Sequence, residues 1–235
     1  MVGIVCALAS EARHLDPTAC ADTPIARLAD GSLLRVSGMG AAAARQAAEA
    51  LLAAGASALA SFGLAGGLDP ALGPGAIFLP SEVAGADGAV LATSRPWRER
   101  LAQALHAQRP RAEGRLLGSA VAVGSVAQKA ALFRASGAAA VDMESLAVAM
   151  VAHDRAVPFI AVRVIVDAAG DALPPAVTAA ADAAGHLKLR PLVLGLLRSP
   201  AQLGALLRLA RCYRAASRSL ALVARSGPFA PLAVS

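Results

Sequence analysis

Aromatic residues are scarce in this sequence of 235 residues, which has 3% of them and a single tryptophan and tyrosine. Proteins that bind single-stranded nucleic acid stack the bases on aromatic side chains, so this scarcity argues against that function. The three cysteines, Cys6, Cys20 and Cys212, show no paired spacing. We therefore expect no disulfide framework and a reducing compartment. The four histidines are scattered along the chain, so we expect no metal site.

Acidic residues are absent from the end of the chain. After Asp182 the tail contains eight lysines and arginines and no aspartate or glutamate. The first 182 residues have 14 basic and 16 acidic residues, so the overall charge of +6 comes from the tail. This distribution argues against a nucleic-acid-binding domain. The sequence MVGIVCALAS also lacks the basic flank of a signal peptide, and we expect a cytoplasmic protein.

Short apolar runs alternate with helical patterns over the first 171 residues. The main strands are expected at 2–8, 33–36, 56–62, 116–123, 138–141 and 158–166, and the helices at 41–54, 95–109, 128–135 and 145–155. This alternation predicts an α/β fold, a single doubly wound domain with a mostly parallel sheet between helices. We expect a catalytic core at 1–171 and a basic helical extension at 172–235, packed on or beside the core.

Chemically useful residues follow five of the apolar runs. They are Glu11, residues 37–40 (SGMG), residues 63–67 (GLAGG), Glu144 and Asp167. Ligands bind outside the carboxyl ends of parallel strands, so these five features are expected to meet at one edge of the sheet. Glycines there would let backbone amides approach a ligand, although tight turns are the simpler explanation. Glu144 could equally be an acid at a helix start, and Asp167 a helix cap.

The sequence VDMES at 141–145, followed by PFIAVRVIVDAAGD at 158–171, resembles the superfamily of purine nucleoside phosphorylases and methylthioadenosine/S-adenosylhomocysteine nucleosidases. The resemblance implies a nucleoside phosphorylase-like fold and cleavage of an N-glycosidic bond without a cofactor. It implies that Asp167 protonates the purine and that Glu11 activates water. Met143 and Glu144 match the pair that binds the ribose.

Further substrate-binding positions follow from the same resemblance. Arg163 matches an arginine near the catalytic water, with a structural partner of a carboxylate as the alternative. Ser37, Gly38 and Gly66 belong to the two glycine-containing segments and are predicted to contact the substrate. The residues that clamp the purine are not assigned.

Two departures concern the nucleophile. Ser61 and Phe62 stand where phosphorylases of this superfamily have a phosphate-binding arginine before Gly63. Their Gly-Asp-Pro-x-Arg pattern is also missing near the N-terminus. A phosphate dianion needs several cationic donors, so hydrolysis is favoured over phosphorolysis. Leu64 stands where many relatives have a small hydroxyl residue.

The segments AVDMES, DAAGDALPPA and LRPLVLGLLRSPAQLGALLRLARCYRAASRSL together resemble the hopanoid-associated phosphorylase branch. This resemblance implies removal of adenine from adenosylhopane, a lipid-linked nucleoside. The alternatives are a methylthioadenosine/S-adenosylhomocysteine nucleosidase and a non-catalytic nucleoside-binding protein. A homodimer is expected from the nucleosidase-like features.

The tail at 186–225 has an amphipathic helical pattern. Arg211, Arg214, Arg218 and Arg225 fall within about 60° of one another at 100° per residue. The opposite side of the helix carries Leu206, Leu209, Tyr213, Leu220 and Val223. Such a helix can lie on an anionic membrane, and we expect peripheral association with the inner face of the cytoplasmic membrane. The alternative is a helix that packs on the sheet while its arginines face water.

Overall fold

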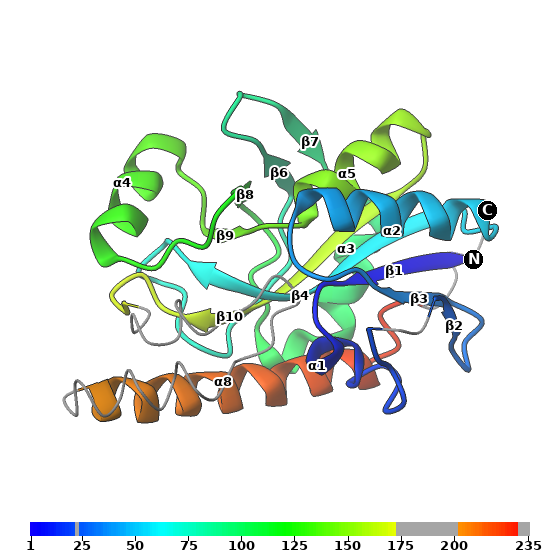
Figure 1. Ribbon diagram of the computed structural model, residues 1–235. Helices are drawn as coiled ribbons and strands as arrows, with labels where there is room; N and C mark the ends of the chain where they lie inside the picture. The colour runs from blue at the N-terminus through cyan, green and yellow to red at the C-terminus, as the bar shows by residue number, and fades with distance from the viewer. Residues whose placement is uncertain (22–23, 173–201, 230–235) are drawn as a thin grey trace.

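The computed structural model describes residues 1–21, 24–172 and 202–229. In these residues one sheet contains β1 (Val2–Cys6), β2 (Ala26–Arg27), β3 (Leu33–Val36), β4 (Ala58–Gly67), β5 (Ile77–Phe78), β6 (Glu82–Ala84), β7 (Val90–Ala92), β8 (Arg115–Gly118), β9 (Ala140–Asp142) and β10 (Phe159–Asp167). The helices are α1 (Ala9–Ala12), α2 (Ala41–Ala53), α3 (Arg95–Ala104), α4 (Val126–Ser136), α5 (Ser145–Asp154) and α8 (Gln202–Arg225), with a short 3₁₀ helix at His106–Gln108 (Figure 1).

Strand β4 is the centre of the sheet. The parallel strand β10 pairs with residues 59–66 of β4 and lies along one side of it. The other side of β4 has two neighbours. Parallel β1 pairs with residues 58–61, and antiparallel β9 pairs with Gly66 and Gly67. Because β9 runs back along β4, its carboxyl end points toward the carboxyl end of β1. The residues that follow these strands are thereby brought together.

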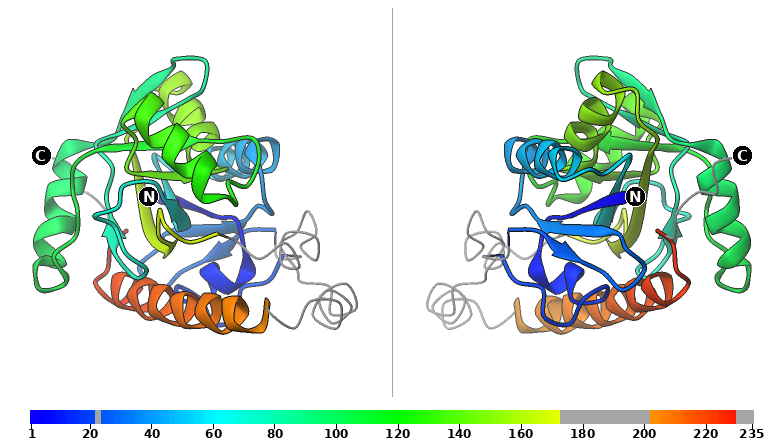
Figure 2. Two further views of the ribbon diagram at one scale, coloured as in Figure 1. Left: turned by 90° about the vertical axis from the view of Figure 1, so that its left-hand side faces the viewer. Right: turned by 90° about the vertical axis from the view of Figure 1, so that its right-hand side faces the viewer.

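Helices cover both faces of the sheet. On one face, Ala47 and Leu51 of α2 and Val148 of α5 pack in one core cluster with the strands. On the other face, Trp97 of α3 and Leu220 of α8 belong to a second cluster. Figure 1 shows α2 and α5 above the sheet and α8 below it, and Figure 2 shows α8 along the whole lower side of the molecule. The predicted α/β class with flanking helices is confirmed.

Three predicted element boundaries are wrong. The strand expected at 56–62 continues through the glycine-rich segment to Gly67, because β10 and β9 both pair with that segment. The strand expected at 116–123 ends at Gly118, because its partners β6 and β9 pair no further. The helix expected at 95–109 ends at Ala104 and is followed by the separate 3₁₀ turn.

The predicted tail helix is present as α8. Leu220 and Val223 are buried against the sheet, as in the alternative of a helix that packs on it, whereas Tyr213 remains 40% exposed. Residues 186–201 and the side chain of Leu206 lie outside the described residues. The boundary between a core at 1–171 and an extension at 172–235 remains a proposal.

Candidate active site

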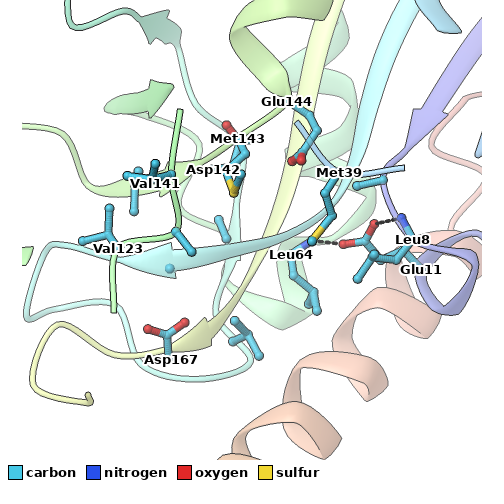
Figure 3. Close-up of a pocket in the computed structure, with 16 residues that line it drawn as sticks. Leu8, Glu11, Met39, Leu64, Val123, Val141, Asp142, Met143, Glu144 and Asp167 are labelled. Atoms are coloured by element: carbon cyan, nitrogen blue, oxygen red, sulfur yellow. Dashed lines mark hydrogen bonds between the residues drawn. The ribbon is translucent and has the colours of Figure 1, made fainter. Parts of the chain in front are cut away.

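A cavity of about 180 Å³ lies where β1, β4, β9 and β10 end (Figure 3). Its lining consists of four carboxylates, a short row of small residues and an apolar wall. The lining residues are Ala7, Leu8, Glu11, Met39, Leu64, Ala65, Gly66, Val121, Ala122, Val123, Val141, Asp142, Met143, Glu144, Val166 and Asp167. The predicted convergence of Glu11, Glu144 and Asp167 is therefore present in the structure.

Glu11 reaches the cavity from α1, the short helix that follows β1. Its carboxylate accepts hydrogen bonds from the backbone amides of Leu8 (3.0 Å) and Leu64 (2.8 Å), so both oxygens are held in place. Burial raises the pKa of Glu11, while the charge of Arg163 and the two amides oppose that rise. A carboxylate with a raised pKa is a stronger base, which suits the activation of water.

Glu144 lies at the cap position before α5. The amide of Gly40 donates a 2.8 Å hydrogen bond to its Oε1 atom. Gly38 and Gly40 have φ angles of 82° and 96°, a region that favours glycine, so the SGMG turn requires them. Burial, together with the charge of Asp142, raises the pKa of Glu144 to about 7. At neutral pH this carboxyl group is therefore present in both protonation states.

Asp167 is the last residue of β10 and lies at the opposite end of the cavity from Glu11 (Figure 3). Its Oδ2 atom accepts a hydrogen bond from the ammonium group of Lys129, a fully buried side chain of α4. Burial raises the pKa of Asp167, and the contact with Lys129 opposes this rise. A carboxyl group with a raised pKa stays protonated to higher pH and can donate that proton to a ligand.

Arg163 lies beneath the cavity in a closed polar network. Its Nε atom donates to Oδ2 of Asp142 (2.8 Å), and a terminal nitrogen donates to the hydroxyl groups of Ser61 (2.5 Å) and Ser145 (2.8 Å). The other oxygen of Asp142, Oδ1, is buried and accepts no hydrogen bond from any described residue. Arg163 is thus the partner of a carboxylate, which is the alternative that the sequence left open.

A β-bulge separates the two functional positions of β10. Arg163 pairs with Gly63, but the register shifts between Ile165 and Asp167, so that Asp167 pairs with Gly66. Side chains alternate along a strand, and Gly63 and Gly66 lie on opposite faces of β4. Arg163 and Asp167 therefore also lie on opposite faces. In a regular strand the four-residue spacing would place both side chains on one face, and the bulge prevents that arrangement.

The predicted substrate-binding residues divide into two groups. Met143, Glu144 and Gly66 line the cavity, whereas Ser37, Gly38 and Arg163 do not. The hydroxyl group of Ser37 donates to the carbonyl of Gly38 (2.7 Å), and Met39 of the same turn lines the cavity instead. The sequence interpretation gave no role to Met39, Asp142 or Lys129. The sequence could have indicated Asp142, because it belongs to the VDMES segment, but no local pattern indicated Lys129.

The charged side chains that line the cavity have one sign. Every charged residue that lines it within the described chain is acidic, namely Glu11, Asp142, Glu144 and Asp167. Arg163 and Lys129 lie close to these carboxylates but do not line the cavity, because Arg163 binds Asp142 and Lys129 binds Asp167. Among residues 1–21, 24–172 and 202–229, no three histidine, cysteine or acidic side chains are grouped so as to hold a metal ion. A neutral or cationic group suits this cavity better than an anion.

Comparison with known families identifies the fold and the superfamily. The sequence model described as "Phosphorylase superfamily" matches residues 3–189, which is most of the chain. The chain belongs to the phosphorylase superfamily. As a member of that superfamily it is a nucleosidase or a nucleoside phosphorylase. No curated protein sequence matches the chain significantly.

Solved structures with the same fold as this phosphorylase superfamily member include two from Helicobacter pylori. One is a futalosine hydrolase, with 18% identity over 96% of this chain and 95% of that chain and a TM-score of 0.66. The other is a 5′-methylthioadenosine/S-adenosylhomocysteine nucleosidase bound to butyl-thio-DADMe-Immucillin-A, with 17% identity over 95% and 97% and a TM-score of 0.66. A nucleosidase of the latter kind from Colwellia psychrerythraea, in complex with adenine, is 21% identical over 72% and 83%, with a TM-score of 0.61. At these identities the likeness concerns the fold.

Proposed function

We propose that this protein hydrolyses the N-glycosidic bond of an adenine nucleoside. The observation that carries the proposal is the cavity, which has Glu11 and Asp167 at opposite ends and is also lined by Glu144 (Figure 3). Cleavage of such a bond needs a proton for the departing base and a base for the incoming water. It also needs an acceptor for the hydroxyl groups of the sugar. Three separate carboxyl groups can supply these three functions.

In this proposal each group has one role. Asp167 donates its proton to a ring nitrogen of the purine while the electron pair of the C–N bond leaves with the base. Glu11 takes a proton from the water that attacks the sugar carbon. Glu144 accepts hydrogen bonds from the ribose hydroxyls, and Met143 packs beside the sugar. The presence of both Glu11 and Asp167 in one cavity counts against a non-catalytic binding protein.

Water is favoured over phosphate by the charges of the cavity. A phosphate dianion would meet four carboxylates and no cationic side chain among the described residues that line the cavity. Phosphate is usually bound by arginine, lysine or several backbone amides. The amides of Leu8 and Leu64, which point into this region, already bind Glu11. Water, a neutral nucleophile, carries no such electrostatic penalty.

For the substrate we propose adenosylhopane, whose adenine is removed in hopanoid biosynthesis. The support is the resemblance of AVDMES, DAAGDALPPA and the tail to the hopanoid-associated branch. The second candidate is methylthioadenosine or S-adenosylhomocysteine, and it is favoured by the names of the solved structures that share the fold. Both substrates carry adenine and ribose and differ in the 5′ substituent.

A comparison of the two substrates decides between adenosylhopane and methylthioadenosine. Adenine release should be measured by chromatography from adenosylhopane in mixed detergent micelles and from methylthioadenosine in the same micelles. The proposal predicts a higher kcat/KM for adenosylhopane. A higher kcat/KM for methylthioadenosine would establish the second candidate, and release from neither would refute the proposed reaction.

We also propose that α8 binds the surface of an anionic membrane. Leu207, Arg211, Arg214, Arg218, Leu222 and Arg225 fall within about 80° of one another around the helix and form a stripe about 27 Å long. The four arginines are exposed, and so are Leu207 (52%) and Leu222 (39%). None of the four forms an ion pair with a described carboxylate, and α8 contains no acidic residue. Arginines next to exposed leucines suit lipid headgroups above an apolar layer.

Flotation with liposomes tests the membrane proposal. The protein should float with vesicles that contain phosphatidylserine, should float less at high salt, and should stay behind with neutral vesicles. Replacement of Arg211, Arg214 and Arg218 by glutamine should abolish flotation, and the same change at Arg13, Arg35 and Arg109 is the matched control. Failure of the wild-type protein to float under any condition would refute membrane binding. No helix in the described part of the chain is both long and apolar enough to cross a membrane.

The homodimer and the cytoplasmic location also remain proposals. The homodimer rests on the nucleosidase-like features, and the cytoplasmic location rests on three cysteines whose spacing in the sequence predicts no disulfide framework. Analytical ultracentrifugation should give twice the chain mass of 23.4 kDa, and a mass of 23.4 kDa would refute the dimer.

A further inference from the structure

Lys129 is the most deeply buried charged side chain near the cavity, with 0% of its surface exposed. It projects from the first turn of α4, whose start is fixed by Ser125. The hydroxyl group of Ser125 accepts from the amide of Gln128 (3.1 Å), and the side chain of Gln128 accepts from the amide of Ser125 (3.3 Å). This reciprocal cap sets the position of the first turn. Lys129 is thereby held where it spans the gap between α4 and the end of β10.

The ammonium group of Lys129 has three donors and finds three acceptors. They are Oδ2 of Asp167, the carbonyl of Ala168 (2.7 Å) and the carbonyl of Asp171 (3.0 Å). The segment after β10 is closed further by the carboxylate of Asp171, which accepts from the amide of Ala168 (3.2 Å). One side chain therefore holds both the carboxyl group of Asp167 and the backbone that follows it.

The two oxygens of Asp167 consequently have different surroundings. Oδ2 is bound to Lys129, whereas Oδ1 receives no hydrogen bond from any described residue. Asp167 also lines the cavity. Rotation of the carboxyl group would break the contact with a buried ammonium group, which is energetically unfavourable. The carboxyl group is therefore locked in the orientation that leaves Oδ1 available to a ligand.

Stability alone does not account for this buried ion pair. Two charges removed from water lose their hydration, and apolar residues of similar size often stabilise a protein as well or better. A buried ion pair that also ends at the cavity carboxylate indicates a role in that cavity. The other described cation of α4, Arg134, is exposed and has no such partner.

We propose that Lys129 is a positioning residue for Asp167, which fixes one carboxyl oxygen and leaves the other oxygen to protonate the purine. This inference rests on the proposed function, because it requires Asp167 to be the acid. When Asp167 gives its proton to the purine, a negative charge forms on a buried carboxylate, and the adjacent ammonium group stabilises that charge. Lys129 keeps its three protons throughout, so the proton balance of the reaction does not change.

The effect on acidity supports the same role. Burial and the charge of Asp171 raise the pKa of Asp167, and Lys129 opposes that rise. A general acid works best when its pKa lies near the working pH. Loss of the cation would make Asp167 a weaker acid that retains its proton to higher pH. The alkaline limb of the kcat profile should therefore move to higher pH, and kcat at the optimum should fall.

The test uses Lys129→Met, which keeps the length of the side chain and removes the charge, with Arg134→Met as the matched control on the same helix. We expect kcat for adenine release to fall, by less than the about 10²–10⁴-fold that a general acid contributes in full, with little change in KM and with the alkaline limb at higher pH. Lys129→Gln serves as a second variant, because its amide can still donate to the two carbonyls. Arg134→Met should behave as the wild-type protein.

A double-mutant cycle separates this role from general support of the fold. If Lys129 acts through Asp167, then Lys129→Met should cause no further loss of kcat in an Asp167→Asn background. Independent, multiplicative losses, or an unchanged pH profile in both Lys129 variants, would overturn the inference. Full activity of Asp167→Asn would instead contradict the proposed function. An impaired Asp167→Asn with fully active Lys129 variants would contradict only the role of Lys129.

Discussion

The carboxylate of Glu11 packs directly against the backbone of Gly63, in space that any other residue would fill. A Cβ atom at position 63 would lie 2.5 Å from Oε1 of Glu11 and 2.9 Å from Oε2. Because Gly63 has no side chain, the carboxylate of Glu11, the proposed base, can reach the amide of Leu64. The glycine is explained by this close approach rather than by a turn.

Gly63→Ala is predicted to inactivate the protein without unfolding it. The added methyl group must displace the carboxylate of Glu11, and a misplacement of about 1 Å can reduce a rate by about 100-fold. Adenine release and circular dichroism measure the two effects. Gly73→Ala is the matched control, because nothing lies within 4 Å of a Cβ atom at that position. Wild-type activity of Gly63→Ala would show that the position of Glu11 is not critical.

The ribose contact is predicted to depend on pH through Glu144. Its pKa of about 7 means that the carboxylate, which accepts hydrogen bonds from the sugar, is lost as the pH falls below neutral. KM for the ribonucleoside should therefore rise from pH 8 to pH 6, whereas KM of Glu144→Gln should stay constant. A KM of the wild-type protein that does not change with pH would remove Glu144 from the ribose site.

The 2′-deoxy analogue provides a separate test of Glu144. A site that binds a hydroxyl group rejects the analogue that lacks it, because its own polar group is left unpaired. The wild-type protein should act poorly on the deoxynucleoside, and Glu144→Gln should narrow the difference in kcat/KM. Equal rates of the wild-type protein on both sugars would leave Glu144 as the acid at the start of α5.

Glu144→Gln is also predicted to stabilise the protein above neutral pH. The folded-state pKa of about 7 lies above the ordinary value of 4.5, so folded protein holds a proton that unfolded chain releases. The bound proton contributes on the order of 3 kcal/mol to the free energy of unfolding. This stabilisation is complete below pH 4.5 and is lost as the pH rises through 7. The melting temperature of the variant should exceed that of the wild-type protein at pH 8 and match it at pH 4. A constant difference across that range would contradict the raised pKa.

The network beneath the cavity predicts a large loss of stability in Arg163→Met. That change leaves Asp142, whose side chain is 2% exposed, as a buried carboxylate without a cation. Breaking a buried pair in this way reduces the free energy of unfolding by about 3–5 kcal/mol. Urea denaturation should show this loss, and addition of Asp142→Asn should restore part of it. A double variant that is less stable than Arg163→Met would argue against the pairing as the cause.

The sequence predicts those parts of the site that are encoded locally. Asp167 ends its strand and Glu144 starts its helix as expected, because each follows an apolar run of the right length. The extent of β4 was missed because Gly63, Gly66 and Gly67 are typical of a turn. Their actual neighbours are carboxylates and strands from elsewhere in the chain.

Contacts between distant residues account for the rest of what the sequence could not predict. Lys129 and Asp167 are 38 residues apart, and Arg163 and Ser61 are 102 apart. The antiparallel direction of β9 and the bulge before Asp167 depend on pairing with β4. The convergence was expected on the condition that the preceding runs are parallel strands, and β9 does not meet that condition. The convergence nevertheless occurs, because β9 runs back toward the end of β1.

The proposed acid predicts a specific loss in Asp167→Asn. The change preserves size but removes the transferable proton, and general acids contribute about 10²–10⁴-fold to a rate. Adenine release should fall by that factor while the melting temperature stays close to that of the wild-type protein. Activity equal to that of the wild-type protein would show that the purine receives its proton from another group.

The central claim is that water attacks the sugar of an adenine nucleoside in this cavity. The most direct measurement is adenine release in phosphate-free buffer made with ¹⁸O-labelled water, with mass spectrometry of the sugar product. We predict that release proceeds without phosphate, that the free sugar carries one ¹⁸O atom, and that Glu11→Gln slows this reaction strongly. Release that requires added phosphate and yields a sugar 1-phosphate without ¹⁸O would contradict the claim and establish a phosphorylase.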